Sequence, residues 1–210
     1  MIDPSQLALF IPVALALNLT PGSDMMFCMA QSMKGGSNAG LAATAGIATG
    51  SFLHSLAAGL GLAAVVATNP LVFEIIRWAG VLYLIYLAYK CFRDHGANLN
   101  TQPDSGAVRS LFAIYRGGCF VNLLNPKVGL FILALVPQFI DPLAGSVFLQ
   151  FMIFGLILNI GGSVICAIVS FSSGRLADYL KRRPLVSRIM NMFSGAVFVG
   201  LAAKLSIASR

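Results

Sequence analysis

Long apolar segments separated by short polar or turn-forming stretches run through this chain. No Asp, Glu, Lys or Arg occurs between Lys34 and Glu74, or between Asp141 and Arg175. A transmembrane helix needs about 20 predominantly apolar residues, so such stretches can each hold one spanning helix with its turns. Hydropathy and turn signals together predict six helical spans, at residues 5–33, 39–67, 71–92, 112–138, 144–171 and 188–207.

Two of these spans, the first and the fourth, are broken near their middle by Pro21 and Pro126, half a chain length apart. Proline removes a backbone donor and clashes with the preceding turn, and hydrocarbon tolerates such a break only where protein or a water-filled cavity satisfies the freed groups. Thr20 before Pro21 and Asn125 before Pro126 both have the form of an N-cap followed by proline, so a half-helix is expected to start at each. Matching interruptions in two halves point to the binding site of a transporter.

Three spans in each half require the second half to sit upside down relative to the first. The prediction is therefore an all-α integral membrane protein whose six transmembrane helices form two inverted three-helix repeats. Residues 1–210 would form a single transmembrane domain, with pseudo-repeats at 1–92 and 112–207. The segment 93–111 is rich in Asn, Gly, Ser, Asp and Pro and is interpreted as a cytoplasmic linker between them.

Composition supports this class and excludes an ordinary soluble domain. Of the 210 residues, 58% are hydrophobic and only 10% are charged. The net charge of +7 is explained by membrane topology and by attraction to anionic lipid, so no nucleic-acid partner is needed. No basic segment precedes the first apolar stretch, so that stretch is expected to remain as a span and not to be a cleaved signal peptide.

Basic residues are unevenly divided between the two sides of the predicted bundle. One side carries Lys34, Lys90, Arg93, Arg109, Arg116, Arg175, Lys181, Arg182, Arg183 and Arg188, and the other carries Arg77, Lys204 and Arg210. Cytoplasmic loops of membrane proteins carry the excess of Lys and Arg. We therefore expect a multi-pass protein of the bacterial cytoplasmic (inner) membrane with both termini outside, and a segment 173–188 that lies on the inner membrane surface.

The two breaks have the chemistry to bind a zwitterion. Free N–H groups and the positive dipole ends of the new half-helices suit a carboxylate, while the open carbonyls of the preceding half-helices suit an ammonium group. Lys127 opposes the dipole of its own helix, so helix stability does not explain it and it needs an anion. That anion is either Asp24, in a pair that contributes to the site or only locks the halves together, or the carboxylate of the substrate. The predicted substrate-binding residues are Asn18, Thr20, Pro21, Gly22, Ser23, Asp24, Asn122, Asn125, Pro126 and Lys127.

Several motifs together resemble the LysE/RhtB family of amino-acid exporters. They are residues 18–22, residues 46–50 with His54, residues 77–84, residues 121–127 and residues 137–139. The resemblance covers essentially the whole chain. It implies a secondary active exporter, and no enzyme, that moves amino acids or close derivatives out of the cytoplasm, driven by the proton gradient.

Two positions depart from the pattern of that family. Ser23 stands where many members have a second proline or similar residue, and Asn159 stands where they have an acidic residue. A neutral Asn159, kept as a secondary site residue, disfavours lysine or arginine as substrate. Proton coupling would then fall to Asp24 or His54, because an unperturbed histidine titrates near pH 6.5. His54 as a neutral interior histidine remains an equal alternative.

Two other functions remain as alternatives. Cys28 and Cys119 lie in the two broken spans, which would allow a transmembrane thiol-disulfide oxidoreductase, although buried cysteine commonly acts as a small apolar residue. A metal-cation exporter would need several convergent carboxylates, histidines or thiolates, and Lys127 would repel the ion. No metal site or cofactor is predicted. The small-residue face at Gly46 and Gly50 favours packing within the chain over a homodimer contact.

Overall fold

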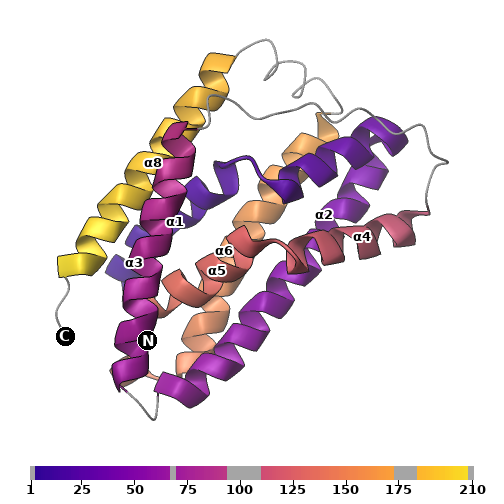
Figure 1. Cartoon of the computed structure of the whole chain (residues 1–210). Helices are drawn as coiled ribbons and strands as arrows, with labels where there is room; N and C mark the ends of the chain where they lie inside the picture. Colours follow the sequence, from indigo (N-terminus) through magenta and orange to yellow (C-terminus); the bar gives the residue numbers. More distant parts are fainter. Residues whose placement is uncertain (1–2, 67–69, 94–109, 173–183, 208–210) are drawn as a thin grey trace.

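The computed structural model describes residues 3–66, 70–93, 110–172 and 184–207, and in these residues every regular element is helical (Figure 1). An all-helical chain is what the sequence predicts. The elements are α1 (Pro4–Leu19), α2 (Ser23–Val66), α3 (Pro70–Arg93), α4 (Leu111–Leu123), α5 (Pro126–Leu135), η1 (Val136–Phe139), η2 (Pro142–Ala144), α6 (Val147–Phe171) and α8 (Pro184–Ile207). The predicted linker 93–111 and the predicted surface segment 173–188 lie largely outside the described residues.

The first break separates α1 from α2 across residues 20–22. The carboxylate of Asp3 caps the start of α1 by accepting from the backbone N–H of Ser5 at 2.9 Å, and this bond lowers the pKa of Asp3. At the other end Thr20 is extended, with ψ of 116°, as expected for a residue before proline. Its hydroxyl donates back to the carbonyl of Ala16 at 2.7 Å.

Thr20 is therefore the C-cap of α1, and the prediction that it is the N-cap of the next helix is wrong. The next helix starts only at Ser23. Its first turn is closed by Met26, whose N–H donates to the carbonyl of Gly22 at 3.0 Å. The hydroxyl of Thr20 instead donates to a carbonyl of the preceding helix, a local hydrogen bond that threonine side chains readily form.

The second break has the N-cap followed by proline that the sequence predicts. Asn125 is the N-cap of α5, with Pro126 directly after it, and its side-chain oxygen accepts from the backbone N–H of Lys127 at 3.0 Å. Helix α4 ends at Leu123, and α4 meets the α5 segment at an angle of 51°.

Helix α2 contains a sharp turn at Gly35 and Gly36. Gly36 has a φ of +73°, which a residue with a side chain rarely adopts, so glycine suits this position. The turn falls at the boundary between the first two predicted spans, and the two parts of α2 run in different directions from it (Figure 1).

The helices pack so that each half of the chain contacts the other. Helix α2 lies against α4 and α6, α3 against α8 and α5, and α1 against α6 and α8. The buried rings of Phe10, Phe139 and Phe154 meet with centroids 4.9–5.8 Å apart. At Gly46 the backbone of α4 comes so close that an added Cβ would collide with the carbonyl of Tyr115. The small-residue face of α2 therefore packs within the chain.

Apolar side chains also cover the outside of the bundle. On α6 the exposed large hydrophobic residues recur every three or four positions and form a stripe: Leu149, Ile153, Leu156, Ile160, Val164, Ile168 and Phe171. By length and composition, Ser23–Gly61 and Val147–Phe171 could each cross a membrane, and the bent pair Leu111–Leu123 with Pro126–Phe139 could form a third span. The described residues are thus all-helical and consistent with a membrane protein, and the six-span inverted repeat stays a prediction.

Candidate functional site

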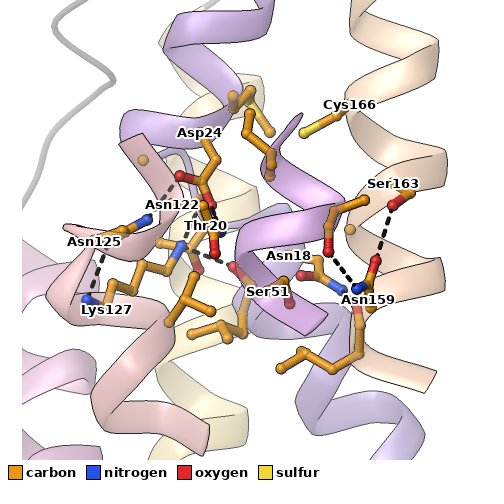
Figure 2. Close-up of a pocket in the computed structure, with 18 residues that line it drawn as sticks. Asn18, Thr20, Asp24, Ser51, Asn122, Asn125, Lys127, Asn159, Ser163 and Cys166 are labelled. Atoms are coloured by element: carbon orange, nitrogen blue, oxygen red, sulfur yellow. Dashed lines mark hydrogen bonds between the residues drawn. The ribbon is translucent and has the colours of Figure 1, made fainter. Parts of the chain in front are cut away.

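The two breaks meet around a small cavity, which we call the polar cavity (Figure 2). Its volume is about 60 Å³, room for only a few water molecules. Most of the predicted site residues line it: Asn18, Thr20, Gly22, Asp24, Asn122, Asn125, Lys127 and Asn159. Residues that lie more than a hundred positions apart in the sequence are thereby brought to one point.

Asp24, in the first turn of α2, is held by side chains of the opposite half. One carboxylate oxygen accepts from the amide nitrogen of Asn122 at 2.8 Å, and the other accepts from the amide nitrogen of Asn125 at 3.0 Å. Hydrogen bonds to an ionised carboxylate are shorter and stronger than neutral ones. The position at a helix N-terminus also favours a negative charge.

Lys127, in the first turn of α5, is held by the backbone of the first half. Its ammonium donates to the carbonyls of Leu17 at 2.8 Å and Thr20 at 2.7 Å, at the open C-terminal end of α1. A cation is favoured at that end by the helix dipole. This placement explains why Lys127 tolerates an unfavourable position in its own helix.

The structure thus gives Asp24 and Lys127 different partners, although the sequence led us to expect a charged pair. The carboxylate of the first half binds amides of the second half, and the ammonium of the second half binds carbonyls of the first half. We call this arrangement the reciprocal brace. It joins the two breaks at two points while the charges remain beside the cavity.

The far side of the polar cavity is lined with side-chain amides and hydroxyls. The amide nitrogen of Asn18 donates to the carbonyl of Leu158 at 3.1 Å, and that of Asn159 donates to the carbonyl of Ala48 at 2.8 Å (Figure 2). Ser163 donates to the side-chain oxygen of Asn159 at 3.2 Å. The amide at position 159 therefore ties α6 to α2, where a carboxylate would need different partners.

Ser51 and Ser163 also line this cavity and were not predicted. A signal was present, since Ser51 follows Ile47 and Ala48 at helical spacing, and all three line the cavity from one face of α2. Ser163 stands four residues after Asn159, which also places both on one face of a helix.

Three predicted residues do not line the polar cavity. Ser23 is exposed, with its hydroxyl 3.4 Å from a carboxylate oxygen of Asp24. Pro21 and Pro126 instead border a second cavity. These positions shape the breaks without presenting polar groups to the polar cavity.

His54 lies near the polar cavity but does not line it. Its ring packs on Gly129 of α5, and its Nε2 lies 3.2 Å from the backbone carbonyl of Asn122. Because a carbonyl only accepts, Nε2 must carry the proton in this contact. His54 therefore touches the same segment that holds Asp24.

The second cavity, which we call the tyrosine cavity, lies against α3 and has a volume of about 380 Å³. Tyr83, Tyr86, Leu87, Lys90 and Cys91 of α3 line it, together with residues of both breaks. Thr20, Gly22 and Lys127 border both cavities, and the Tyr83 hydroxyl donates to the carbonyl of Lys127 at 3.2 Å. Nothing in the sequence led us to expect this cavity.

Neither alternative function gains support from the structure. Within the described part of the chain, no group of three or more His, Cys, Asp or Glu side chains is arranged to hold a metal ion. The four cysteines form no disulfide with one another, and Cys28 lies 3.4 Å from the hydroxyl of Thr44 in a buried cluster.

Comparisons with known proteins agree on one family. The model of a family described as LysE type translocator matches residues 15–209. A relative from Vibrio cholerae, named only as an uncharacterized membrane protein, is 34% identical over 95% of both chains. Relatives from Salmonella typhimurium and Salmonella typhi, named homoserine/homoserine lactone efflux protein, are 33% and 32% identical over 91% of both chains. No solved structure matches this chain.

Proposed function

Because this chain belongs to the family of LysE type translocators, we propose that it is a secondary active exporter of a small amino acid or a close derivative. The observation that carries the proposal is the reciprocal brace, in which two broken helices hold opposite charges beside one polar cavity. Two relatives are named for the efflux of homoserine and homoserine lactone, so these compounds are the first to test.

The charged groups of a zwitterionic amino acid can replace each hydrogen bond of the reciprocal brace with one of their own. The carboxylate of the amino acid would bind the ammonium of Lys127 in place of the carbonyls of Leu17 and Thr20. The ammonium of the amino acid would then bind those two carbonyls. The amides of Asn122 and Asn125 offer further donors to the carboxylate, while Asp24 offers acceptors to the ammonium. Substrate binding would therefore open the internal contacts between the halves without leaving a charge unpaired.

Opening these contacts provides a physical basis for alternating access. In the proposed arrangement the two halves are inverted repeats of three spans each, with both termini outside the cytoplasmic membrane, and one set of helices rocks against the other around a fixed site. Without substrate, the reciprocal brace keeps the site closed. A bound amino acid stabilises the open contacts that allow the halves to move.

A proton could act on the same contacts. Protonation of Asp24 removes the charge that accepts from Asn122 and Asn125, which weakens both bonds and loosens one side of the brace. His54 is the second candidate, since a charge change there acts on the carbonyl of Asn122. Entry of a proton would then favour release of substrate to the outside.

The experiment that tests the proposal measures efflux of labelled amino acids, homoserine included, from cells expressing the wild type and the Lys127→Ala variant. Each strain is measured with and without a proton uncoupler. We expect selective, uncoupler-sensitive efflux that the variant loses. A matched control is Lys34→Ala, because Lys34 is exposed beside the Gly35 turn and lines neither cavity.

Absence of efflux of every amino acid from folded, membrane-inserted wild type would refute the proposal. Efflux that persists in the Lys127→Ala variant would leave an exporter but remove Lys127 from its site.

A further inference from the structure

The tyrosine cavity differs from the polar cavity in size and in chemistry. At about 60 Å³ the polar cavity is well below the volume range of small-molecule sites, so in this conformation it holds only part of a molecule such as homoserine. The tyrosine cavity, at about 380 Å³, is within the range of roughly 300–1,000 Å³ that is typical of small-molecule sites.

The walls of the tyrosine cavity combine aromatic rings with a cation. The rings of Tyr83 and Tyr86 lie 6.1 Å apart between centroids, and Leu87 and Leu130 add aliphatic surface. Lys90 lies over the ring of Tyr86, with its ammonium 5.8 Å from the centroid. Among the described residues that line this cavity there is neither Asp nor Glu.

The position of Lys90 bears on which ligand charge the tyrosine cavity favours. It stands in the last turn of α3, at the end of the helix that the distribution of Lys and Arg predicts to be cytoplasmic. Lys127, Thr20 and Gly22 line the same cavity and also border the polar cavity. The lining therefore offers a carboxylate two cations, Lys90 and Lys127, whereas an isolated amine meets two like charges.

We infer that the tyrosine cavity is a second binding site, for carboxylates that carry an apolar or aromatic side chain. The carboxylate binds Lys90, and the side chain packs on the rings of Tyr83 and Tyr86. The inference rests on the proposed function and deepens it, because such a site would load amino acids before they reach the polar cavity.

The test is equilibrium binding to the purified full-length protein in detergent micelles, so it does not depend on transport. The probes are labelled phenylacetate, benzylamine and benzyl alcohol, which share one ring and differ in charge. We expect saturable binding of phenylacetate at least about tenfold tighter than that of the other two, a factor that corresponds to about 1.4 kcal/mol.

Matched variants on the same helix locate the binding. Tyr86 and Tyr89 are 52% and 55% exposed, but only Tyr86 lines the cavity, so Tyr86→Ala is compared with Tyr89→Ala. Likewise Lys90→Gln is compared with Arg93→Gln, since both are exposed cations near the end of α3. We expect Tyr86→Ala and Lys90→Gln to weaken phenylacetate binding about tenfold, and their controls to leave it within twofold.

Equal binding of phenylacetate and benzyl alcohol would overturn the inference, because it would make the cavity an apolar surface without selection for the carboxylate. Equal effects of Tyr86→Ala and Tyr89→Ala would overturn it too. A wild type that binds phenylacetate but exports no amino acid would refute the proposed function and leave the binding site standing.

Discussion

The two proline breaks have similar sequences but different structures. At the second break Asn125 caps the following helix and Pro126 begins it, whereas at the first break Thr20 ends the preceding helix and the next one starts at Ser23. The first break presents backbone carbonyls and one carboxylate. The second presents two side-chain amides and an ammonium. The two halves of the chain are therefore complementary at the site, as donors and acceptors, and do not duplicate one another.

The largest effect is expected from Lys127→Ala. The change leaves the carbonyls of Leu17 and Thr20 without their donor, and an unsatisfied buried polar group costs about 1–3 kcal/mol. We expect efflux to fall at least tenfold and the midpoint of thermal unfolding in detergent to decrease. Lys127→Arg, which keeps the charge and the donors, should be less damaging in both measurements. Equal unfolding midpoints for wild type and Lys127→Ala would mean that the ammonium does not join the halves.

Asp24→Asn tests the other side of the brace. The variant keeps the shape of the side chain but loses the charge that accepts from two amides, so we expect efflux to fall about tenfold, given that hydrogen bonds to charged groups contribute about 1.5–3 kcal/mol. If Asp24 carries the proton, the pH dependence of efflux should disappear in this variant and persist in His54→Gln. A pH profile that neither substitution alters would exclude both residues from coupling.

Gly50→Ala would disturb the contact that positions the second break. A Cβ at Gly50 would lie 2.9 Å from the Cβ of Asn122 and from the carbonyl of Cys119, and overpacking of this kind costs about 1–3 kcal/mol. We expect a lower unfolding midpoint and slower efflux, because Asn122, which donates to Asp24, must shift. Gly61→Ala is the control, since a Cβ there meets no atom of the described residues within 4 Å. Similar unfolding midpoints and efflux rates for Gly50→Ala and Gly61→Ala would show that α2 and α4 can move apart with little loss of stability.

The smallest effects are expected from substitutions of the two capping residues, Asn125 and Thr20, and they should differ between the two. Asn125→Ala removes an N-cap, a change that typically costs about 1 kcal/mol, and it also removes one bond to Asp24. Thr20→Val removes the bond to the carbonyl of Ala16, which adds little to helix stability, and a long 4.0 Å contact with the sulfur of Cys91. Thermal unfolding should therefore show a clear decrease for Asn125→Ala and almost none for Thr20→Val. The reverse order would mean that Thr20 has a role at the site that its hydrogen bond does not reveal.

Local rules account for what could be predicted from the sequence. Hydropathy predicts an all-helical membrane protein, and proline predicts breaks near residues 21 and 126, because both effects act within one or two helical turns. The start of α5 after Asn125 follows from the same short-range chemistry. At Thr20 two local partners competed for the hydroxyl, the backbone N–H groups of the following helix and the carbonyl of Ala16 in the preceding one, and the residues alone did not decide between them.

The sequence by itself determined the helices, the positions of the two breaks and the residue types gathered there, and it carried a family resemblance that the comparisons confirm. Only the tertiary structure decided the partners. Lys127 binds the end of α1, Asp24 binds Asn122 and Asn125, and Tyr83 borders a cavity beside them. The physical reason is that helix propensity and capping depend on neighbours along the chain, whereas a charge takes the best partner in space. That partner lies about a hundred residues away, where the opposite half of the chain folds against the first.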